Sequence, residues 1–438
     1  MTSRASDMRQ RVATRLSLSG MAGLGAMLGL GNITLTWLVF GRSVEADIWL
    51  LALSIALALS QLSQLGVEQV VVFSAEAHAT SAQRGQDFDR DSMSWALGFG
   101  LAFALLALLV TPALIPWFAA GFGAEQRNRL GGALAPLMLL VALAPGMMVL
   151  GQQLMLAGRQ HLAVCVLNLN ALVQFIALLA CWVSSNTSPD TLALAFGSAA
   201  ALLGLAVIAS LGPPRTLRVM PDFRALLPFI RSSVAMRGAH SAHNFVVVLL
   251  INSALTAGAE GTVAVYQYAR KVADGLTSIA IGPHQAVYLA ALARAWAHAD
   301  RLSLRRESSD YLWTSLLLLT GATLLLSLVA GAAATLAPTA AKAIGIDGGV
   351  MLAVLVLWQA LVAIESIPVA VLSVDRRAGS MLCVNAVFAL GLYAVLTWLV
   401  VPPHGGIPVV LSMLFCQIGS TVLFALVASR CVRHRFGS

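Results

Sequence analysis

Three charged side chains lie inside a stretch of sequence that is otherwise apolar and long enough to cross a bilayer. Residues 262–293 form this stretch, and Arg270, Lys271 and Asp274 lie within it. On a helix, Gln267, Arg270 and Asp274 fall near one stripe, with Lys271 at its flank. An ionisable group at membrane depth costs roughly 2.5–3.5 kcal/mol on insertion scales, so it usually faces a partner or a polar cavity. Two interpretations follow: Arg270 and Asp274 neutralise each other, or the stripe faces a substrate or an ion.

A second apolar stretch, residues 232–256, carries Arg237, His240 and Asn244 on one helical face. Arg237 lies about two turns from one end of this stretch, where a long side chain can extend to the membrane surface. An arginine and a histidine so close together in a membrane helix are unusual, and the pattern predicts that this face lines a cavity.

Acidic residues mark two further positions. Glu365 lies within an apolar stretch, three residues before Pro368, and a proline there removes a backbone hydrogen bond. We predict an ion-coupling site or a hinge at Glu365 and Pro368, with Glu365 either protonated or paired with residues 232–256 or 262–293. Glu68 is a weaker candidate for ion coupling, because it lies near the predicted membrane boundary.

The composition explains why charges inside apolar stretches matter. Hydrophobic residues make up 59% of the 438 residues and charged residues 11%, which indicates a polytopic all-α membrane protein. The net charge of +8 does not indicate nucleic-acid binding, because the basic residues cluster between apolar stretches on alternate sides. The five cysteines have neither disulfide nor metal-ligand spacing, so no metal or other cofactor is expected.

Twelve apolar stretches are candidate membrane spans. With the N-terminus in the cytoplasm, 20 Lys and Arg residues lie inside and 4 outside, so both termini are predicted to be cytoplasmic. Residues 213–231 are the central polar interruption and predict a cytoplasmic linker with a short amphipathic surface helix. This linker divides the chain into an N-terminal lobe (1–212) and a C-terminal lobe (232–438). The predicted spans are 16–40, 47–74, 93–119, 130–157, 162–183, 190–211, 232–256, 262–293, 311–336, 349–373, 379–400 and 406–429.

The sequence contains no pattern typical of an enzyme. It has no phosphate-binding loop, no Ser/His/Asp set and no metalloprotease motif. Every predicted outward loop is short, whereas membrane enzymes that transfer or polymerise glycans need a sizeable outward loop. A transporter is therefore the preferred class. A membrane glycosyl-transferring enzyme and a transport-inactive scaffold that recruits partners remain alternatives.

Two short motifs resemble those of a known superfamily. Phe40-Gly41 and Ala46-Asp47 lead into the second span, and Tyr268-Ala269 is followed by Lys271 and Asp274. They resemble the multidrug/oligosaccharidyl-lipid/polysaccharide (MOP) flippase superfamily, particularly its murein-precursor (MurJ-like) and polysaccharide-repeat (Wzx-like) branches. The resemblance implies two six-helix lobes around a central cavity, in the cytoplasmic (inner) membrane of a bacterium.

The resemblance also implies a substrate and partners. The substrate is an undecaprenyl-pyrophosphate-linked oligosaccharide that moves from the inner to the outer leaflet for surface polysaccharide assembly. Lys271 and Asp274 match the basic and acidic cavity positions of the superfamily. Expected partners are membrane lipids, a glycan polymerase and glycosyltransferases of the same pathway, without nucleic acid.

The choice between branches rests on the basic residues. Murein-precursor flippases usually have an acid at the position of Arg270, carry arginines in the first two helices and often have fourteen spans. These differences favour a polysaccharide-unit flippase, with a lipid II flippase and a cation-coupled multidrug antiporter as alternatives.

A pyrophosphate needs cationic donors, and the only Arg and Lys residues within the predicted spans are Arg237, Arg270 and Lys271. Coupling to H⁺ or Na⁺ need not be strict, because the membrane potential assists export of an anion.

Overall fold

The computed structural model describes residues 25–436, except 26, 68, 158, 186, 213–220, 281–287, 289–291, 293–294, 297–299, 337, 376 and 399–405. The described residues form helices and connecting turns, without a strand, and the predicted all-α polytopic architecture is confirmed. The helix Met27–Phe40 comes first. It is followed by α2 (Val44–Ser63), the short 3-10 helix η1 (Gln64–Gly66), α3 (Val70–Thr80), α4 (Ala82–Phe118), α5 (Ala124–Leu156), α6 (Gln160–Val183), α7 (Pro189–Leu211), α8 (Phe223–Thr256), α9 (Thr262–Ala280), α11 (Arg301–Leu336), α12 (Pro338–Val374), α13 (Ala378–Trp398) and α14 (Gly406–Phe436).

Side-chain caps fix where several helices begin. Ser43 accepts a hydrogen bond from the Ala46 backbone N–H at the start of α2, and Asp222 accepts two at the start of α8. Ser188 caps α7, whose first residue is Pro189. These residues satisfy backbone donors that have no partner within the helix.

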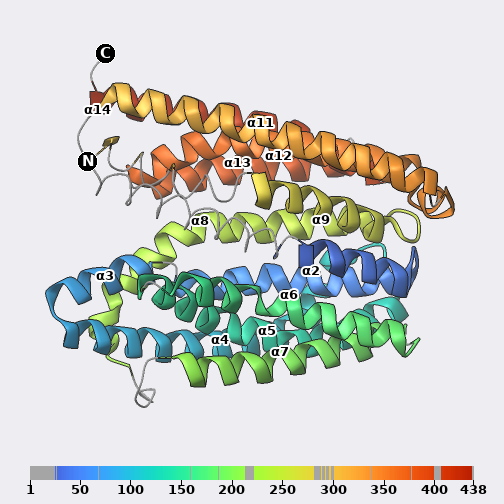
Figure 1. Cartoon of the computed structure of the whole chain (residues 1–438), viewed down its shortest axis with the longest axis horizontal. Coiled ribbons are helices and arrows are strands. Elements are labelled where there is room, and N and C mark those ends of the chain that lie inside the picture. Colours follow the sequence, from blue (N-terminus) through green and yellow to red (C-terminus); the bar gives the residue numbers. More distant parts are fainter. Residues whose placement is uncertain are drawn as a thin grey trace, which may run out of the picture.

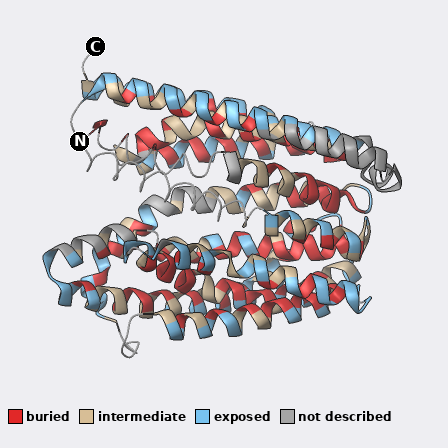
Figure 2. Ribbon diagram, viewed as in Figure 1, coloured by how far each residue is buried: buried red, intermediate tan, exposed pale blue. Residues whose placement is uncertain are grey.

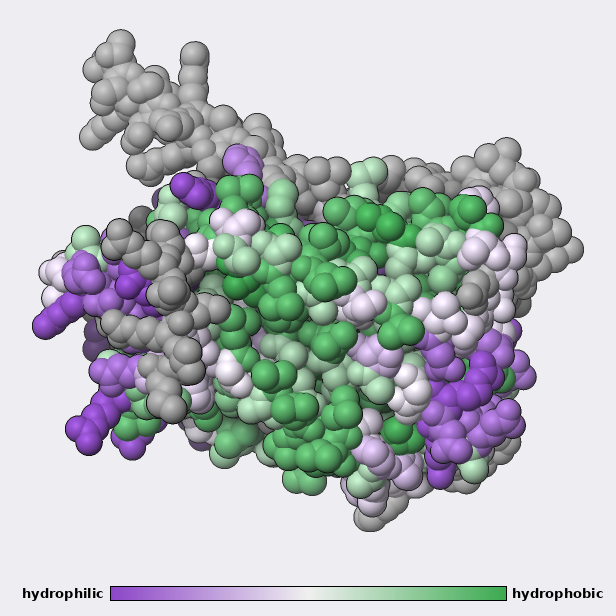
Figure 3. Space-filling view, turned by 90° about the horizontal axis from the view of Figure 1, so that it is seen from below, coloured by the Kyte–Doolittle hydropathy of each residue, from purple (hydrophilic) through white to green (hydrophobic). Residues whose placement is uncertain are grey.

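Each of the twelve predicted spans overlaps a helix. Eight of the described helices are long and apolar enough to cross a membrane, and Met27–Phe40 and His243–Thr256 are shorter apolar segments. The helix α9 is not among them, because three charged residues lie within its nineteen positions. Figure 3 shows a broad apolar belt on one face of the molecule, with hydrophilic residues towards both ends.

Two predicted boundaries are wrong. The second span was predicted as one helix over 47–74, but it breaks at η1. The break occurs where two backbone groups bond to side chains of other helices. Trp95 Nε1–H donates to the Gly66 carbonyl at 3.1 Å, and the Gln69 N–H donates to Ser233 Oγ at 3.1 Å. In the predicted linker, residues 223–231 are the first turns of α8 instead of a separate short helix. Residues 213–220 of the linker lie outside the described part.

The helices form two groups that α8 joins. The helices α2, α4, α5, α6 and α7 pack against one another, and α9, α11, α12, α13 and α14 form the other group, as Figure 1 shows. Both α8 and α9 contact α2, and α8 contacts helices of both groups. The helix contacts do not test the division into lobes 1–212 and 232–438, which stays a prediction.

The buried core shows where the two groups are joined. One continuous cluster contains residues of α2, α4, α5, α8, α9, α12 and α14, including Trp49, Leu134, Ile251 and Tyr266. Towards the opposite ends of the helices the core divides into two clusters, one around Tyr311 and Phe424 and one around Met93 and Phe229. In Figure 2 the buried residues, coloured red, lie where the helices pack against one another. The two groups therefore share a core at the end where α2 and α9 begin.

At this shared end, Asp47 of α2 binds the first turn of α9. Its carboxylate accepts the backbone N–H of Gly261 at 2.8 Å and that of Ala264 at 2.7 Å, and Asp47 is 4% exposed. Gly261 has a φ of +78°, which favours glycine. An acidic side chain at a helix N-terminus also interacts favourably with the helix dipole. Asp47 thus fixes the start of α9, although it lies more than 200 residues away in sequence.

We expect Asp47→Ala to destabilise the protein by roughly 1–3 kcal/mol, because it leaves two buried backbone N–H groups without an acceptor. Asp47→Asn keeps one carbonyl oxygen and should fall between Asp47→Ala and the unmodified protein. The measurement is thermal unfolding of the detergent-solubilised protein.

Glu45→Ala is the matched control, because Glu45 lies in the same turn and forms a partly exposed ion pair with Arg129 at 3.3 Å. Such pairs contribute about 0–1 kcal/mol. Equal destabilisation by Asp47→Ala and Glu45→Ala would show that the contact with α9 contributes nothing.

Candidate functional site

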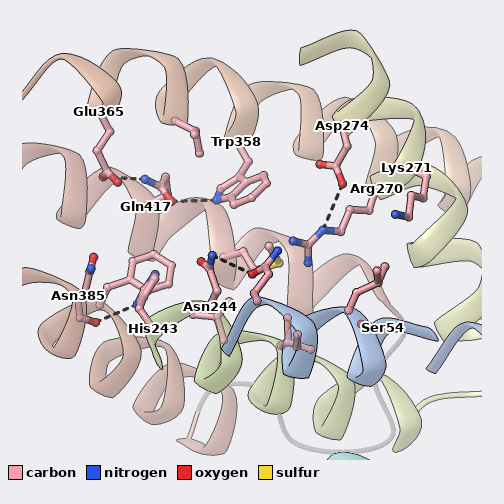
Figure 4. A pocket seen from close by; sticks show the side chains of 18 of the residues that line it. Ser54, His243, Asn244, Arg270, Lys271, Asp274, Trp358, Glu365, Asn385 and Gln417 are labelled. Atoms are coloured by element: carbon pink, nitrogen blue, oxygen red, sulfur yellow. Dashed lines mark hydrogen bonds and ion pairs between the residues drawn. The ribbon is translucent and has the colours of Figure 1, made fainter. Parts of the chain in front are cut away.

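A cavity of about 420 Å³ lies where the two helix groups meet. Its lining comes from α2, α8, α9, α12, α13 and α14 (Figure 4). Apolar side chains such as Leu53, Val247 and Phe388 make up much of the wall, and polar and charged side chains project between them. This mixture of an apolar wall and a few polar groups is typical of ligand-binding cavities.

The helix α9 contributes the charged residues predicted from the sequence. Gln267, Arg270, Lys271 and Asp274 all line the cavity. One face of the helix brings them together, because positions three and four apart lie one above the other. The predicted clustering of these residues is therefore found in the structure.

Arg270 is held by three neighbours. Its Nη1 donates to the hydroxyl of Tyr266 at 3.0 Å, and its Nε lies 3.8 Å from Asp274 Oδ2. The guanidinium carbon is 5.8 Å from the centre of the Trp358 ring, within cation–π range. The predicted neutralisation of Arg270 by Asp274 is thus present in this structure, beside the cavity.

Asp274 is shared between two helices. Its Oδ1 accepts a hydrogen bond from Gln359 Nε2 of α12 at 2.7 Å, in addition to its pairing with Arg270. The contact fixes α9 against α12 at the level of the cavity.

Lys271 differs from Arg270. Within the described part of the chain, its ammonium group makes no hydrogen bond and no ion pair within 4.0 Å, although it lines the same cavity. Figure 4 shows Lys271 beside Arg270 on α9. Its three N–H donors thus have no acceptor among the described residues, although the nearby carboxylate of Asp274 interacts with its charge.

Glu365 of α12 also lines the cavity. Its Oε2 accepts from Gln417 Nε2 at 2.7 Å and from Thr421 Oγ1 at 3.2 Å. The expected pairing with α8 or α9 is absent from the described contacts, because both donors belong to α14. The other end of the Gln417 amide accepts from Trp358 Nε1 at 3.0 Å, so Trp358 connects the surroundings of Glu365 with those of Arg270.

Of the residues predicted on α8, Asn244 lines the cavity. Asn244 donates to Gln61 Oε1 of α2 at 3.3 Å, and about two turns further along, Asn252 donates to Ser54 Oγ at 3.3 Å. The side chains of Arg237 and His240 lie outside the described part, as does Glu68. Pro368 lies inside α12, which continues to Val374.

Several lining residues were not predicted. Trp358, Asn385 and Gln417 are the main examples. They are neutral side chains in apolar helices, and only the packing of α12, α13 and α14 brings them to the cavity. His243 also lines it; its Nδ1 lies 3.2 Å from the Asn385 carbonyl, and its ring packs edge-on against Phe388. The described residues contain no group of three or more His, Cys, Asp and Glu that could hold a metal ion.

Comparison with known proteins gives similarity of fold. No protein-family model and no curated protein matches the sequence. Among solved structures, the chain is similar to lipid II flippase MurJ in an inward closed conformation, with a TM-score of 0.70 and 14% identity over 94% of this chain and 87% of that one.

Multidrug transporters give matches of comparable quality. An inward-facing multidrug resistance MATE family transporter of the MOP superfamily has a TM-score of 0.67 and 15% identity over 96% of this chain and 98% of its own. The MATE multidrug transporter DinF-BH has a TM-score of 0.69 and 12% identity, with 96% of each chain covered. The chain therefore has the fold that lipid II flippase MurJ and these MATE transporters share.

Proposed function

We propose that this protein is a flippase that moves an undecaprenyl-pyrophosphate-linked oligosaccharide from the inner to the outer leaflet by alternating access, for cell-surface polysaccharide assembly. The observation that carries the proposal is the central cavity, in which the Lys271 ammonium makes no hydrogen bond and no ion pair within 4.0 Å to a described residue. A desolvated ammonium group favours an anion such as a pyrophosphate. Glycan polymerases and glycosyltransferases of the same pathway would be its partners, in the bacterial cytoplasmic membrane with both termini inside.

The other lining groups suit a glycan. Gln267, Gln61 and Asn244 carry amides that can both donate to and accept from sugar hydroxyls. Trp358 adds an aromatic surface in the same cavity. Arg270 can strengthen anion binding where a phosphate replaces Asp274 as its partner, because Arg binds phosphate in a bidentate geometry.

The divided core supports alternating access. The groups share one core at the Asp47 end, whereas the opposite end has two separate clusters. In the proposed cycle, the contacts between α2 and α9 break as the separate clusters approach each other. Outward transfer of the anionic substrate is assisted by about 2.3 kcal/mol per charge per 100 mV of membrane potential.

Two alternatives belong to the same superfamily. A lipid II flippase is supported by the similarity in fold to MurJ. A cation-coupled multidrug antiporter is supported by the MATE matches and by the acids Asp274 and Glu365 in the cavity. For the proposed flippase and for both alternatives, Glu365 is the candidate site of H⁺ or Na⁺ coupling, and Pro368 the candidate hinge.

Depletion of the protein distinguishes these functions. We expect a sugar-bearing undecaprenyl-pyrophosphate intermediate to accumulate on the cytoplasmic face, because its synthesis continues while export stops. The measurement is leaflet-specific labelling and sugar analysis of the lipid-linked glycans. A peptide-bearing murein precursor would instead identify a lipid II flippase. Unchanged glycans, with drug sensitivity in a pump-deficient host, would establish the antiporter.

Substitution of Lys271 tests its proposed role in anion binding. We expect Lys271→Ala to weaken substrate binding about 10- to 100-fold, because a hydrogen bond to a charged group contributes about 1.5–3 kcal/mol. Lys271→Arg should restore most of the binding. The measurement is binding of the lipid-linked glycan to purified protein, together with complementation of the depleted cells.

Thr277→Ala is the control on the same helix, because the one described hydrogen bond of the Thr277 hydroxyl is to the carbonyl of Ala273 in its own helix. Normal binding by Lys271→Ala would rule out the assigned role of Lys271, and an equal loss in Thr277→Ala would indicate a general disturbance of α9.

Substitution of Glu365 tests ion coupling. We expect Glu365→Gln to abolish the dependence of transport on H⁺ or Na⁺, because an amide keeps an acceptor for Gln417 and Thr421 but carries no charge. The measurement is flipping by protein in liposomes across a pH series, with and without a Na⁺ gradient. The same ion dependence in Glu365→Gln and in the unmodified protein would exclude Glu365 as the coupling site.

A further inference from the structure

A second cavity, of about 510 Å³, lies between α4 and α5, away from the central one. Residues 108–116 of α4 and 124–138 of α5 form its walls, and none of these residues lines the central cavity. Only 28% of the most apolar stretch of α4 is buried within the protein, against 67% for α5. The groove therefore opens on a helix that faces the lipid bilayer.

Small residues and prolines create the groove. Pro112 and Pro116 lie one turn apart on α4, and Gly131 and Ala135 lie one turn apart on α5; all four line it. A Cβ added to Gly131 would meet only Ile115 Cδ1, at 3.4 Å, so the space beside Gly131 is not filled by the helix backbone. Since Pro112 and Pro116 have no N–H, the carbonyls of Leu108 and Pro112 lose their usual helical donors.

The groove has a polar end and an apolar depth. Arg127 and Asn128 lie near the start of α5, close to where α4 ends. Leu108 and Met138 lie two or more turns further into the membrane span. Trp117, 67% exposed near the end of α4, is typical of a side chain at the membrane–water interface.

Arg127 is positioned by the end of α4. Its Nε donates to the Ala119 carbonyl at 3.1 Å and its Nη2 donates to the Ala120 carbonyl at 2.8 Å. A guanidinium has five N–H donors, and these contacts use two of them. Arg127 is the charged residue among those that line the groove, and its remaining donors suit a phosphate.

We propose that the groove between α4 and α5 binds a membrane phospholipid, with an anionic headgroup phosphate at Arg127 and an acyl chain along Gly131 and Ala135. The groove has a cation at the membrane–water interface and apolar walls deeper in the membrane. A phospholipid has its anionic phosphate and its acyl chains in the same order. This site is separate from the proposed transport cavity, so it does not depend on which substrate the protein carries.

The test is native mass spectrometry of the purified full chain with phosphatidylglycerol, a diacylglycerol of the same chains, or glycerol 3-phosphate. We expect the unmodified protein to retain phosphatidylglycerol about tenfold better than diacylglycerol, as one charge-assisted contact predicts. Arg127→Gln should remove this preference. Ala135→Leu should weaken retention of both lipids, because it fills the groove.

Ala102→Leu is the matched control, because Ala102 is exposed on α4 and does not line the groove. It should bind both lipids as the unmodified protein does, and thermal unfolding verifies that each variant is folded. An unchanged preference in Arg127→Gln, or an equal loss in Ala102→Leu and Ala135→Leu, would overturn the proposal. Displacement of phosphatidylglycerol by equimolar glycerol 3-phosphate would also overturn it, since the site would then bind phosphate without the chains.

Discussion

The hydrogen bonds from Gly261 and Ala264 to Asp47 determine where α9 begins and therefore where its charges lie. Lys271 follows Gly261 by ten positions, which on a helix is about 15 Å along the axis. At this distance from the polar end of the molecule, Arg270 and Lys271 lie in its apolar interior. One buried carboxylate on α2 thus controls the depth of a charged cluster on α9. The same contact joins the two helix groups, so the position of the cluster and the closure of that end depend on each other.

The charged residues on α9 have separate roles because their neighbours differ. Arg270 is balanced by Asp274 and packed near Trp358, while Asp274 also binds Gln359 of α12. These contacts keep an arginine stable at membrane depth without a ligand. Lys271, one position further along, lies about 100° around the helix and has no such partner among the described residues. The cavity therefore combines an arginine paired with Asp274 and a lysine that makes no hydrogen bond and no ion pair within 4.0 Å to a described residue.

The sequence predicted the spans well because the length of an apolar stretch is a local property. It also predicted the stripe of Gln267, Arg270 and Asp274, since helical periodicity alone defines a stripe. The break at Gly66 was not predictable, because it depends on hydrogen bonds from Trp95 and to Ser233, which come from other helices. The partner of Glu365 was missed for the same reason: Gln417 is one neutral residue in an apolar helix, and only the packing of α12 against α14 brings the two together.

The charge balance of the cavity links anion binding to the state of Glu365. The ionisable side chains that line it in the described part, besides His243, are Arg270, Lys271, Asp274 and Glu365. With Glu365 ionised their charges sum to zero, and with Glu365 protonated the sum is +1. An anion in this cavity interacts more favourably with the protonated state, because a buried negative charge is removed. The two binding equilibria are linked. If protonation of Glu365 strengthens anion binding, a bound anion strengthens proton binding to Glu365 by the same factor. The hydrogen bonds from Gln417 and Thr421 oppose this effect, because they stabilise the ionised form. In the proposed transport cycle, the burial of Glu365, these donors and a bound anion together decide how strongly a proton accompanies the substrate.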